Sequence, residues 1–493
     1  MILSESTKAI LWKAFLLVLP ISSFTILSRI LGNTNVAPLA LIPMLIILLL
    51  WWLPQFFKVG RSLPYQLQPL LLFFFVGVLS TLLITFRNIP TFQGVSWYKG
   101  ILEVVASFAM GVGFYLVTIY MVKNEELLRS TLFWISIAGI VLMAYSWFQM
   151  GIWYLLGRYP AWLYTVQSFF SSNGMLFPRR ATGLAFEPSW LAHELNMVYI
   201  PIWLGLSIKK VSIFKRKILN KYQTEFVLLV LSILTLFISF SRIGWITLFC
   251  LLTYIIFRQL DKLIKKISSK SSQINQQGPR IFLYRFALWA GLFLLLMAAL
   301  LIAGFVLTKL DPRMSDFFDL KTLRDDGFMR WASQLVFLER IMYWIAGYGV
   351  FQKFPFLGAG FGMPGYFFQS TVPVYGSQLL DINDFMLKVS FLPNTKNLWV
   401  RILSETGIVG FALFSSWLVY HWRNSVELER YDRSDLLKAM GLIGKLILIA
   451  MIVEGFSLDT FGLPYYWVGL GLIVASWRAK THRQTSKLNQ ESA

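Results

Sequence analysis

The chain has 493 residues, of which 57% are hydrophobic and only 14% are charged, and its mean hydropathy is +0.62. This composition excludes a soluble globular protein, and the repeated apolar runs of about 20 residues have the length that a helix needs to cross a bilayer. A transmembrane β-barrel is also excluded, because its strands are short segments of alternating hydrophobicity. The sequence therefore predicts an all-α, polytopic transmembrane helical bundle.

The formal net charge is +21, and in a membrane protein such an excess indicates topology rather than nucleic-acid binding. The single cysteine, Cys250, excludes a disulfide framework and a CxxC metal site. The three histidines, His193, His421 and His482, are too scattered for a histidine-based metal cluster. No small-residue cleavage site follows a short apolar core at the N-terminus, so we expect no removable signal peptide.

Twelve apolar runs are predicted to be membrane spans. Their approximate limits are 10–30, 37–57, 68–86, 99–122, 131–150, 187–208, 224–240, 243–258, 286–308, 398–420, 439–455 and 463–477. Lysine and arginine in short loops determine the orientation of such a protein. The basic loops after spans six, eight and ten and the basic C-terminal segment all fall on one side in this count, together with both termini. We expect that side to be the cytoplasm.

The predicted organisation has four parts. Residues 1–308 hold spans one to nine, 309–397 form a large outer loop, 398–477 hold spans ten to twelve, and 478–493 form a cytoplasmic tail. The loop contains WASQLVFLERIMYWIAGYGVF, which has helical apolar spacing, and then the glycine-rich FPFLGAGFGMPGYF. Long loops are usually functional or folded on themselves, so we expect one or two amphipathic helices there.

Basic residues recur on the outer side, where the positive-inside rule depletes them. The group consists of Arg179 and Arg180 before span six, Arg242 between spans seven and eight, Arg340 in the long loop, and Lys396 with Asn397 at the start of span ten. The planar fork of arginine binds phosphate oxygens in pairs. The group therefore predicts a strongly anionic ligand, such as a diphosphate.

Structural interpretations stay open for several of these residues. Arg180 could anchor the end of a span, and Arg340 could lie on the solvated face of its helix. Arg401 lies one turn inside span ten with Glu405 four residues later, and the two could form only a buried salt bridge.

Two carboxylates near the outer side are further candidates. Glu187 directly precedes Pro188, which fits the first turn of a helix but equally a base or a ligand for a sugar hydroxyl. Glu454, near the outer end of span eleven, is a weaker candidate. His193 is predicted to be a packed polar residue.

Four motifs occur in order between Phe177 and Phe411: RATGLAFEPSWLA, SFSRIGW, the R-x-x-x-W of Arg340 to Trp344 running on to FPFLGAGFG, and KNLWVRILSETGIVGF. This order resembles the O-antigen ligase and polymerase family, membrane enzymes that ligate or polymerise bacterial surface polysaccharide. The resemblance implies a multi-span, GT-C-like glycosyltransferase fold with a large periplasmic loop. It also implies transfer of glycan from undecaprenyl diphosphate to another glycan or to lipid A core, without nucleotide sugar, metal or other cofactor.

The resemblance also assigns roles by motif. Arg242 and Arg340 match the arginines that engage the diphosphate, and Arg180 matches the arginine of the R-x-T-G motif. Ligases of the family have a His-Asn pair where this chain has Lys396-Asn397, and their histidine activates the acceptor hydroxyl. A lysine is a different group, which favours a polymerase and makes Glu187 a better candidate for the base.

We therefore expect a metal-independent, inverting glycosyltransferase of the bacterial inner membrane, with both termini cytoplasmic and the active site periplasmic. The expected catalytic residues are Arg180, Arg242, Arg340, Lys396 and Glu187, and the expected substrate-binding residues are Arg179, Asn397, Arg401 and Glu405. Expected partners are a lipid-linked oligosaccharide donor, a glycan or lipid acceptor, membrane lipids and a chain-length regulator, but no nucleic acid. The alternatives are an O-antigen ligase and a transporter or flippase for a lipid-linked sugar or small anion; the inverted repeat of many transporters is not evident in the sequence.

Overall fold

The computed structural model describes residues 3–60, 63–214, 217–218, 221–270, 319–334, 338–373, 392–431 and 433–491, with isolated positions at 376, 382 and between 286 and 308. Within these residues the chain is mostly helical. The strands found there, β1 (Lys217–Ile218) and β2 (Tyr222–Gln223), form one two-stranded antiparallel hairpin. The predicted all-α class is confirmed.

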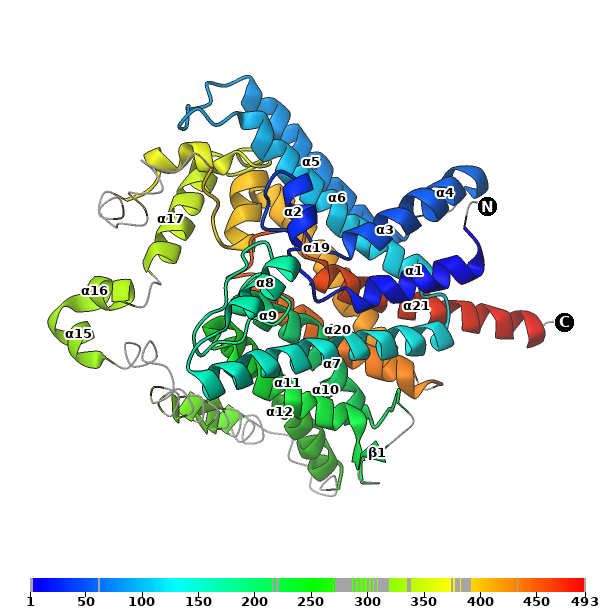
Figure 1. Ribbon diagram of the computed structural model, residues 1–493. Coiled ribbons are helices and arrows are strands. Elements are labelled where there is room, and N and C mark those ends of the chain that lie inside the picture. The colour runs from blue at the N-terminus through cyan, green and yellow to red at the C-terminus, as the bar shows by residue number, and fades with distance from the viewer. Residues whose placement is uncertain are drawn as a thin grey trace. The chain divides into compact units, whose positions relative to one another are not determined.

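The chain divides into two compact units, each described here by itself. The first unit is Met1–Gly244 with Met342–Ala493, and the second is Trp245–Ile341. The first unit contains α1 (Glu5–Leu17), α2 (Thr25–Ile30), α3 (Leu41–Ile47), η1 (Leu48–Trp52), α4 (Leu53–Val59), η2 (Tyr65–Leu67), α5 (Gln68–Thr85), α6 (Trp97–Met121), α7 (Glu125–Leu156), α8 (Ala161–Phe170), α9 (Pro188–Glu194), η3 (Leu195–Tyr199), α10 (Ile200–Lys209), α11 (Thr224–Ile238), η5 (Pro364–Ser370), α19 (Leu398–Arg430), α20 (Asp435–Glu454) and α21 (Pro464–Glu491). Figure 1 shows the N-terminus and the C-terminus on the same side of this unit.

The second unit contains most of α12 (Arg242–Lys270), then α15 (Leu320–Asp325), α16 (Gly327–Gln334) and the first turn of α17 (Leu338–Lys353), whose remainder belongs to the first unit. Asp319 caps α15, because its carboxylate accepts the backbone N–H of Thr322 at 3.1 Å. The hydrogen bond from the Thr322 hydroxyl lowers the pKa of this carboxyl. Helices α15, α16 and α17 lie in the segment where amphipathic helices were expected.

Among the described residues, seven helical segments are long and apolar enough to cross a membrane. They are Leu41–Lys58, Tyr65–Thr85, Trp97–Met121, Glu125–Leu156, Arg242–Lys262, Leu398–Arg430 and Asp435–Glu454. Each corresponds to one of the predicted spans, and α11 is a shorter apolar helix at the position of another. The chain is thus an integral, polytopic membrane protein.

The other predicted spans differ from this pattern. The first one, 10–30, is wrong as a single helix, because α1 and α2 are separate. Pro20 lies between them, and a proline lacks the N–H and the space that a continuing helix requires. The backbone there pairs elsewhere, since Phe24 donates its N–H to the carbonyl of Ala37 at 2.8 Å.

Two further predicted spans are helical, although they are not among the seven. The span at 187–208 consists of α9, the π-helical η3 and α10 in direct succession, and that at 463–477 is the start of α21. The span at 286–308 lies largely outside the described residues.

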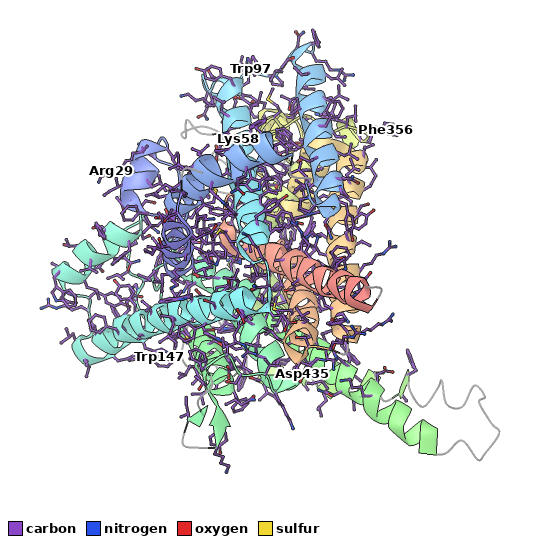
Figure 2. All side chains as sticks on the ribbon, turned by 90° about the vertical axis from the view of Figure 1, so that its right-hand side faces the viewer. Arg29, Lys58, Trp97, Trp147, Phe356 and Asp435 are labelled. Carbon is purple, nitrogen blue, oxygen red and sulfur yellow. The ribbon has the colours of Figure 1, made fainter. Side chains whose placement is uncertain are left out.

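Aromatic side chains form the core where α5, α6, α19 and α21 pack. The ring of Phe73 lies 5.4 Å from Phe414 and 5.9 Å from Phe361, and Phe108 meets Trp467 at 6.0 Å. Figure 2 shows side chains between the packed helices. Because Phe361 belongs to the glycine-rich segment, that segment is anchored directly in the core.

Candidate functional site

The R-x-T-G motif is held by two glutamines buried among the helices. Gln149 of α7 accepts the backbone N–H groups of Thr182 at 3.1 Å and Gly183 at 2.9 Å. Gln167 of α8 accepts from the Gln149 amide at 2.9 Å and donates to the carbonyl of Gly183 at 3.3 Å. Both glutamines are fully buried. The irregular backbone of the motif thereby finds the partners that buried polar groups require.

The same motif is joined to the turn before α12. Ala181 donates its N–H to the carbonyl of Ile238 at 2.9 Å, and the Nε of Arg180 donates to the carbonyl of Ser239 at 3.2 Å. Arg242 is the first residue of α12, three positions after Ser239. The structure therefore brings the segments that carry Arg180 and Arg242 together.

The turn that begins at Phe177 holds the side chain of Arg180 in place. Phe177 and Arg180 form an antiparallel bridge, and the Arg180 guanidinium lies over the Phe177 ring at 5.7 Å. The hydroxyl of Tyr159 donates to the Phe177 carbonyl at 3.3 Å, and burial raises the pKa of Tyr159 to about 12. Tyr159 thus stays a neutral donor at any physiological pH. Arg179 has a positive φ of 60° and is exposed to solvent, which turns it away from the packed side of the motif.

Glu187 immediately precedes α9, as the sequence predicts for a helix start. Its carbonyl accepts from Trp190 at 3.0 Å and from Leu191 at 3.2 Å. Its carboxylate makes no capping bond to the backbone and instead accepts the Ser189 hydroxyl. The half-buried carboxylate is therefore not committed to holding the helix end.

A buried polar network ties α9 to α12 and α20. The Nδ1 of His193 and the Oε2 of Glu454 lie 2.5 Å apart, and the amide of Asn196 donates to the other oxygen of Glu454 at 2.6 Å. Asn196 also donates to the carbonyl of Gly244 at 2.9 Å. A side chain at Gly244 would bring its Cβ within 2.8 Å of the Cβ of Ala192, so the glycine permits this close approach. His193 is buried and hydrogen-bonded, as predicted for a packed polar residue.

Lys396 and Asn397 begin α19 as predicted. The side-chain oxygen of Asn397 accepts the N–H groups of Trp399 at 2.9 Å and Val400 at 3.1 Å, so this buried residue is the helix cap. Lys396, with a φ of 50°, places its ammonium 4.3 Å from the centre of the Tyr343 ring. Leu398 donates its N–H to the carbonyl of Gly455 at 2.8 Å, which joins the start of α19 to the end of α20.

Arg401 and Glu405 form a salt bridge at 3.0 Å, with side chains that are 11% and 3% exposed. Glu405 also accepts the N–H of Gly362 at 3.1 Å, and Arg401 donates to the carbonyl of Asp459. The pair therefore clasps the glycine-rich segment against α19. These contacts show that both residues stabilise the fold. That role is independent of whether they also bind a substrate.

Helix α19 is broken inside the E-x-G motif. Gly407 has φ 63° and ψ −165°, a conformation that essentially only glycine adopts. The backbone around it pairs with the glycine-rich segment, since Ala359 and Gly360 donate to the carbonyls of Ser404 and Glu405 at 2.8 and 2.9 Å. On the other side of the break, the N–H groups at 408 and 409 bond to the carbonyls at 355 and 356. Two of the motifs seen in the sequence are thus one structural element.

Arg340 lies in the second unit, half-buried in the first turn of α17. Tyr343, whose ring contacts Lys396, follows one turn later on the same helix. The expected meeting of Arg340 with Arg180 and Arg242 stays a prediction.

Gln149 and Gln167 are the parts of the arrangement that sequence reasoning missed. Polar residues within predominantly apolar helices are a signal for buried hydrogen-bonded sites, and both residues carry that signal. Asn196, inside the span at 187–208, carries it as well.

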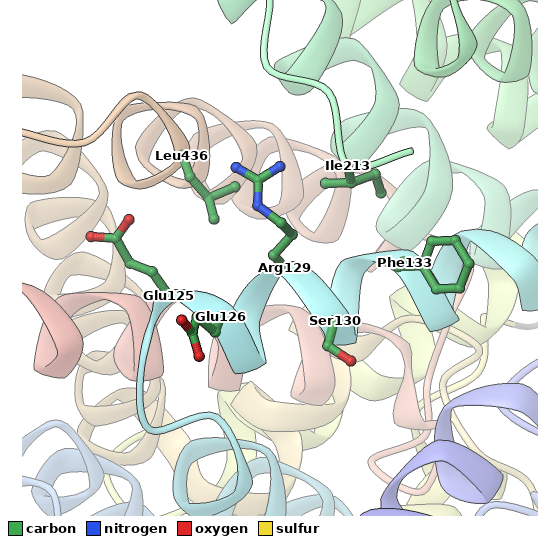
Figure 3. Close-up of a pocket in the computed structure, with 7 residues that line it drawn as sticks. All are labelled: Glu125, Glu126, Arg129, Ser130, Phe133, Ile213 and Leu436. Atoms are coloured by element: carbon green, nitrogen blue, oxygen red, sulfur yellow. The ribbon is translucent and has the colours of Figure 1, made fainter. Parts of the chain in front are cut away.

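A cavity of about 560 Å³ opens at the other end of α7. It is lined by Glu125, Glu126, Arg129, Ser130, Phe133, Ile213 and Leu436. Figure 3 shows the Arg129 guanidinium between Leu436 and Ile213, and its Nη1 donates to the carbonyl of Ser212 at 2.5 Å. A helix rises about 1.5 Å per residue, so Arg129 and Gln149 lie about 30 Å apart along α7. This cavity is therefore separate from the segments that carry Arg180 and Arg242.

Residues 227–415 match the family model described as O-antigen ligase. No curated protein and no solved structure matches the chain. The matched range begins within α11 and ends within α19, so it includes Arg242, Arg340 and the Lys396-Asn397 pair, whereas Arg180 and Glu187 precede it. This part of the membrane protein is thus similar to the O-antigen ligase family, which supports the resemblance expected from the sequence motifs.

Proposed function

We propose that the protein polymerises undecaprenyl-diphosphate-linked oligosaccharide at the periplasmic face of the bacterial inner membrane, in O-antigen or exopolysaccharide biosynthesis. The observation that carries this proposal is the joining of Arg180 to the carbonyl of Ser239, beside the turn from which Arg242 begins α12. Two motifs that lie far apart in the sequence thereby carry their cations on adjoining segments. Such an arrangement suits a lipid-linked diphosphate, which enters from the bilayer and carries two adjacent phosphates.

The proposed reaction is a single displacement with inversion at the anomeric carbon. The oxygen of the acceptor hydroxyl attacks this carbon, and the bond from the carbon to the diphosphate oxygen breaks. The electron pair of that bond leaves with undecaprenyl diphosphate, while the hydroxyl proton passes to a base. Arg180, Arg242 and Arg340 stabilise the charge that develops on the leaving group, and such fixed electrostatic stabilisation is often the largest catalytic contribution.

Glu187 is the proposed base. Its carboxylate accepts a hydroxyl from Ser189 and makes no backbone capping bond, so it resembles a group placed for a polar ligand rather than for helix stability. Lys396 assists with the diphosphate, and Arg179, Asn397, Arg401 and Glu405 form or support the surrounding substrate site. The four-part organisation, with a periplasmic loop at 309–397 and both termini cytoplasmic, belongs to the same proposal.

An O-antigen ligase is the second candidate, and the description of the matched family favours it. The residue at 396 separates the two, because a lysine stands where ligases of the family carry histidine. A deletion strain tests both. Accumulation of single repeat units, either transferred to core or still lipid-linked, supports the polymerase. Full-length polymer left on undecaprenyl diphosphate, with bare core outside, supports the ligase. Unaltered polysaccharide overturns both and returns the transporter to consideration.

A further inference from the structure

The C-terminal end of α20 bonds to the run that follows Glu187 and to the start of α19, and it reaches α12 through Asn196. Glu454, its last residue, binds Asn196 and His193 of the run from α9 to η3, which begins next to Glu187. Asn196 continues to the carbonyl of Gly244, two residues after Arg242. The next residue along, Gly455, accepts the N–H of Leu398 at 2.8 Å, two residues after Lys396.

This junction is buried and closely hydrogen-bonded. Glu454 and Asn196 are fully buried, and His193 is 1% exposed. A buried carboxylate is costly unless its oxygens are hydrogen-bonded, and here each oxygen has one partner at 2.5 or 2.6 Å. Trp399 adds a further bond, from its Nε1 to the carbonyl of Ile452 at 3.0 Å.

We propose that Glu454 is a positioning residue for the transfer reaction, with Asn196 as its link to α12. By holding Gly244 through Asn196, and standing next to Gly455, Glu454 sets the placement of Arg242 relative to Lys396. Two cations that bind one diphosphate must keep a fixed separation, because each misplaced contact loses the benefit of orientation. Glu454 itself does not touch the substrate. This inference rests on the proposed function.

The sharpest variant is Asn196→Ala. It removes the connection between Glu454 and Gly244 but leaves the bond between His193 and Glu454, so the buried carboxylate keeps a partner. The comparison is Glu454→Gln. The amide oxygen of the glutamine still accepts from Asn196, and its amide nitrogen donates to Nδ1 of His193 once the imidazole carries its proton on Nε2. The control is Glu225→Gln, because Glu225 is an equally buried carboxylate that accepts from the N–H of Ile213 at 2.6 Å and lies in the first turn of α11, at the opposite end of that helix from Arg242.

Each purified full-length variant is placed in lipid nanodiscs, and its melting temperature and its affinity for undecaprenyl diphosphate are measured together. Chain length is measured in the complemented deletion strain. Asn196→Ala should lower the melting temperature of the ligand-free protein modestly, because one oxygen of Glu454 loses its partner. It should also weaken undecaprenyl diphosphate binding by about tenfold and lower polymer yield by tenfold or more, which exceeds the effect of the lost stability. Glu454→Gln and Glu225→Gln should stay within about threefold of the unmodified protein in both measurements.

Two results would overturn the inference. One is an Asn196→Ala protein with unaltered binding and chain length. The other is a loss that follows the melting temperature alone, which would make the network merely structural. The proposed function fails differently: the unmodified protein would not bind undecaprenyl diphosphate, or Arg242→Ala would bind it as well as the unmodified protein does.

Discussion

The Nε of Arg180 donates to the backbone carbonyl of Ser239 at 3.2 Å, between residues that are 59 positions apart in the chain. Helices α9 to α11 intervene in sequence, so the bond depends on the tertiary fold. It directs a cation to the turn from which Arg242 starts the next helix. The proposed diphosphate site is therefore as rigid as the packing of α11 against the R-x-T-G motif.

Arg242→Ala is expected to abolish long polysaccharide while the protein still inserts in the membrane. The substitution removes a proposed bidentate contact to the leaving diphosphate, and losing one such charge-stabilising group costs about a hundredfold to a thousandfold in rate. Chain length on gels of the complemented deletion strain is the measurement. Arg423→Ala, at an exposed position of α19, is the matched control and should leave the polymer unchanged. Normal chain lengths in Arg242→Ala would remove this residue from the site.

Glu187→Gln is expected to lower polymer synthesis by a hundredfold or more, because an amide cannot take the proton of the acceptor hydroxyl; general-base catalysis contributes about 10²–10⁴. Folding should be unaffected, since the carboxylate makes no backbone cap. Donor binding should persist in nanodiscs with undecaprenyl diphosphate. The exposed Glu126, on α7, supplies the control Glu126→Gln. Full activity in Glu187→Gln would require another base.

Lys396→Ala is expected to reduce polymer yield by about tenfold, and Lys396→Arg to restore most of it. The ammonium lies 4.3 Å from the ring centre of Tyr343, and a guanidinium satisfies both this cation–π contact and a phosphate. Hydrogen bonds to charged groups are worth about 1.5–3 kcal/mol, which corresponds to tenfold or more. If Lys396→Ala made polymer normally, the lysine would have no role in transfer.

The salt bridge between Arg401 and Glu405 is expected to be costly to break singly. Arg401→Leu should lower the free energy of unfolding by about 3–5 kcal/mol, because it leaves a buried carboxylate without its cation. The double replacement of both residues by leucine should recover part of that loss. Unfolding in detergent, followed by circular dichroism, measures both. Equal losses in the single and double variants would show that the two side chains are not coupled.

Gly407→Ala is expected to prevent a stable fold. An added Cβ would lie 2.3 Å from the carbonyl oxygen of Phe356, and the backbone conformation alone costs an alanine about 1–3 kcal/mol. Gly151→Ala is the control, because a Cβ there meets no atom within 4 Å and alanine favours a helix by up to about 1 kcal/mol. The amount of monodisperse protein after detergent extraction distinguishes them. A well-folded Gly407→Ala protein would contradict the close packing described at this residue.

Composition was sufficient to predict the helical membrane fold, because apolar length is a local property. The position of Arg242 at the junction of two helices could also be predicted, since Ser241 and Arg242 interrupt an apolar run. Pro20 indicates the break between α1 and α2, but the apolar residues on both sides of it led to the prediction of one continuous span. A proline within a helical pattern deserves more weight than the mean hydropathy of its window.

The break at Gly407 was not predictable in the same way. The residues around Gly407 have the pattern of an ordinary apolar helix. The groups that bond to the broken turn are backbone groups near Phe356, and a backbone partner cannot be recognised from the pattern of side chains. The connection from Glu454 to Asn196 was missed for a related reason: the two residues lie 258 positions apart, and each alone reads as an isolated polar residue in a span. Local sequence shows that such a group is present but not what it bonds.

The pairing of 355–362 with 404–409 also has an evolutionary consequence. Backbone amides and carbonyls within a bilayer must be bonded, and the glycine-rich segment supplies partners to the interrupted helix at these positions. Neither stretch can be replaced without the other. A recombinant that takes one from this chain and the other from a divergent relative would carry unmatched amides, so the two should be inherited together as a single module.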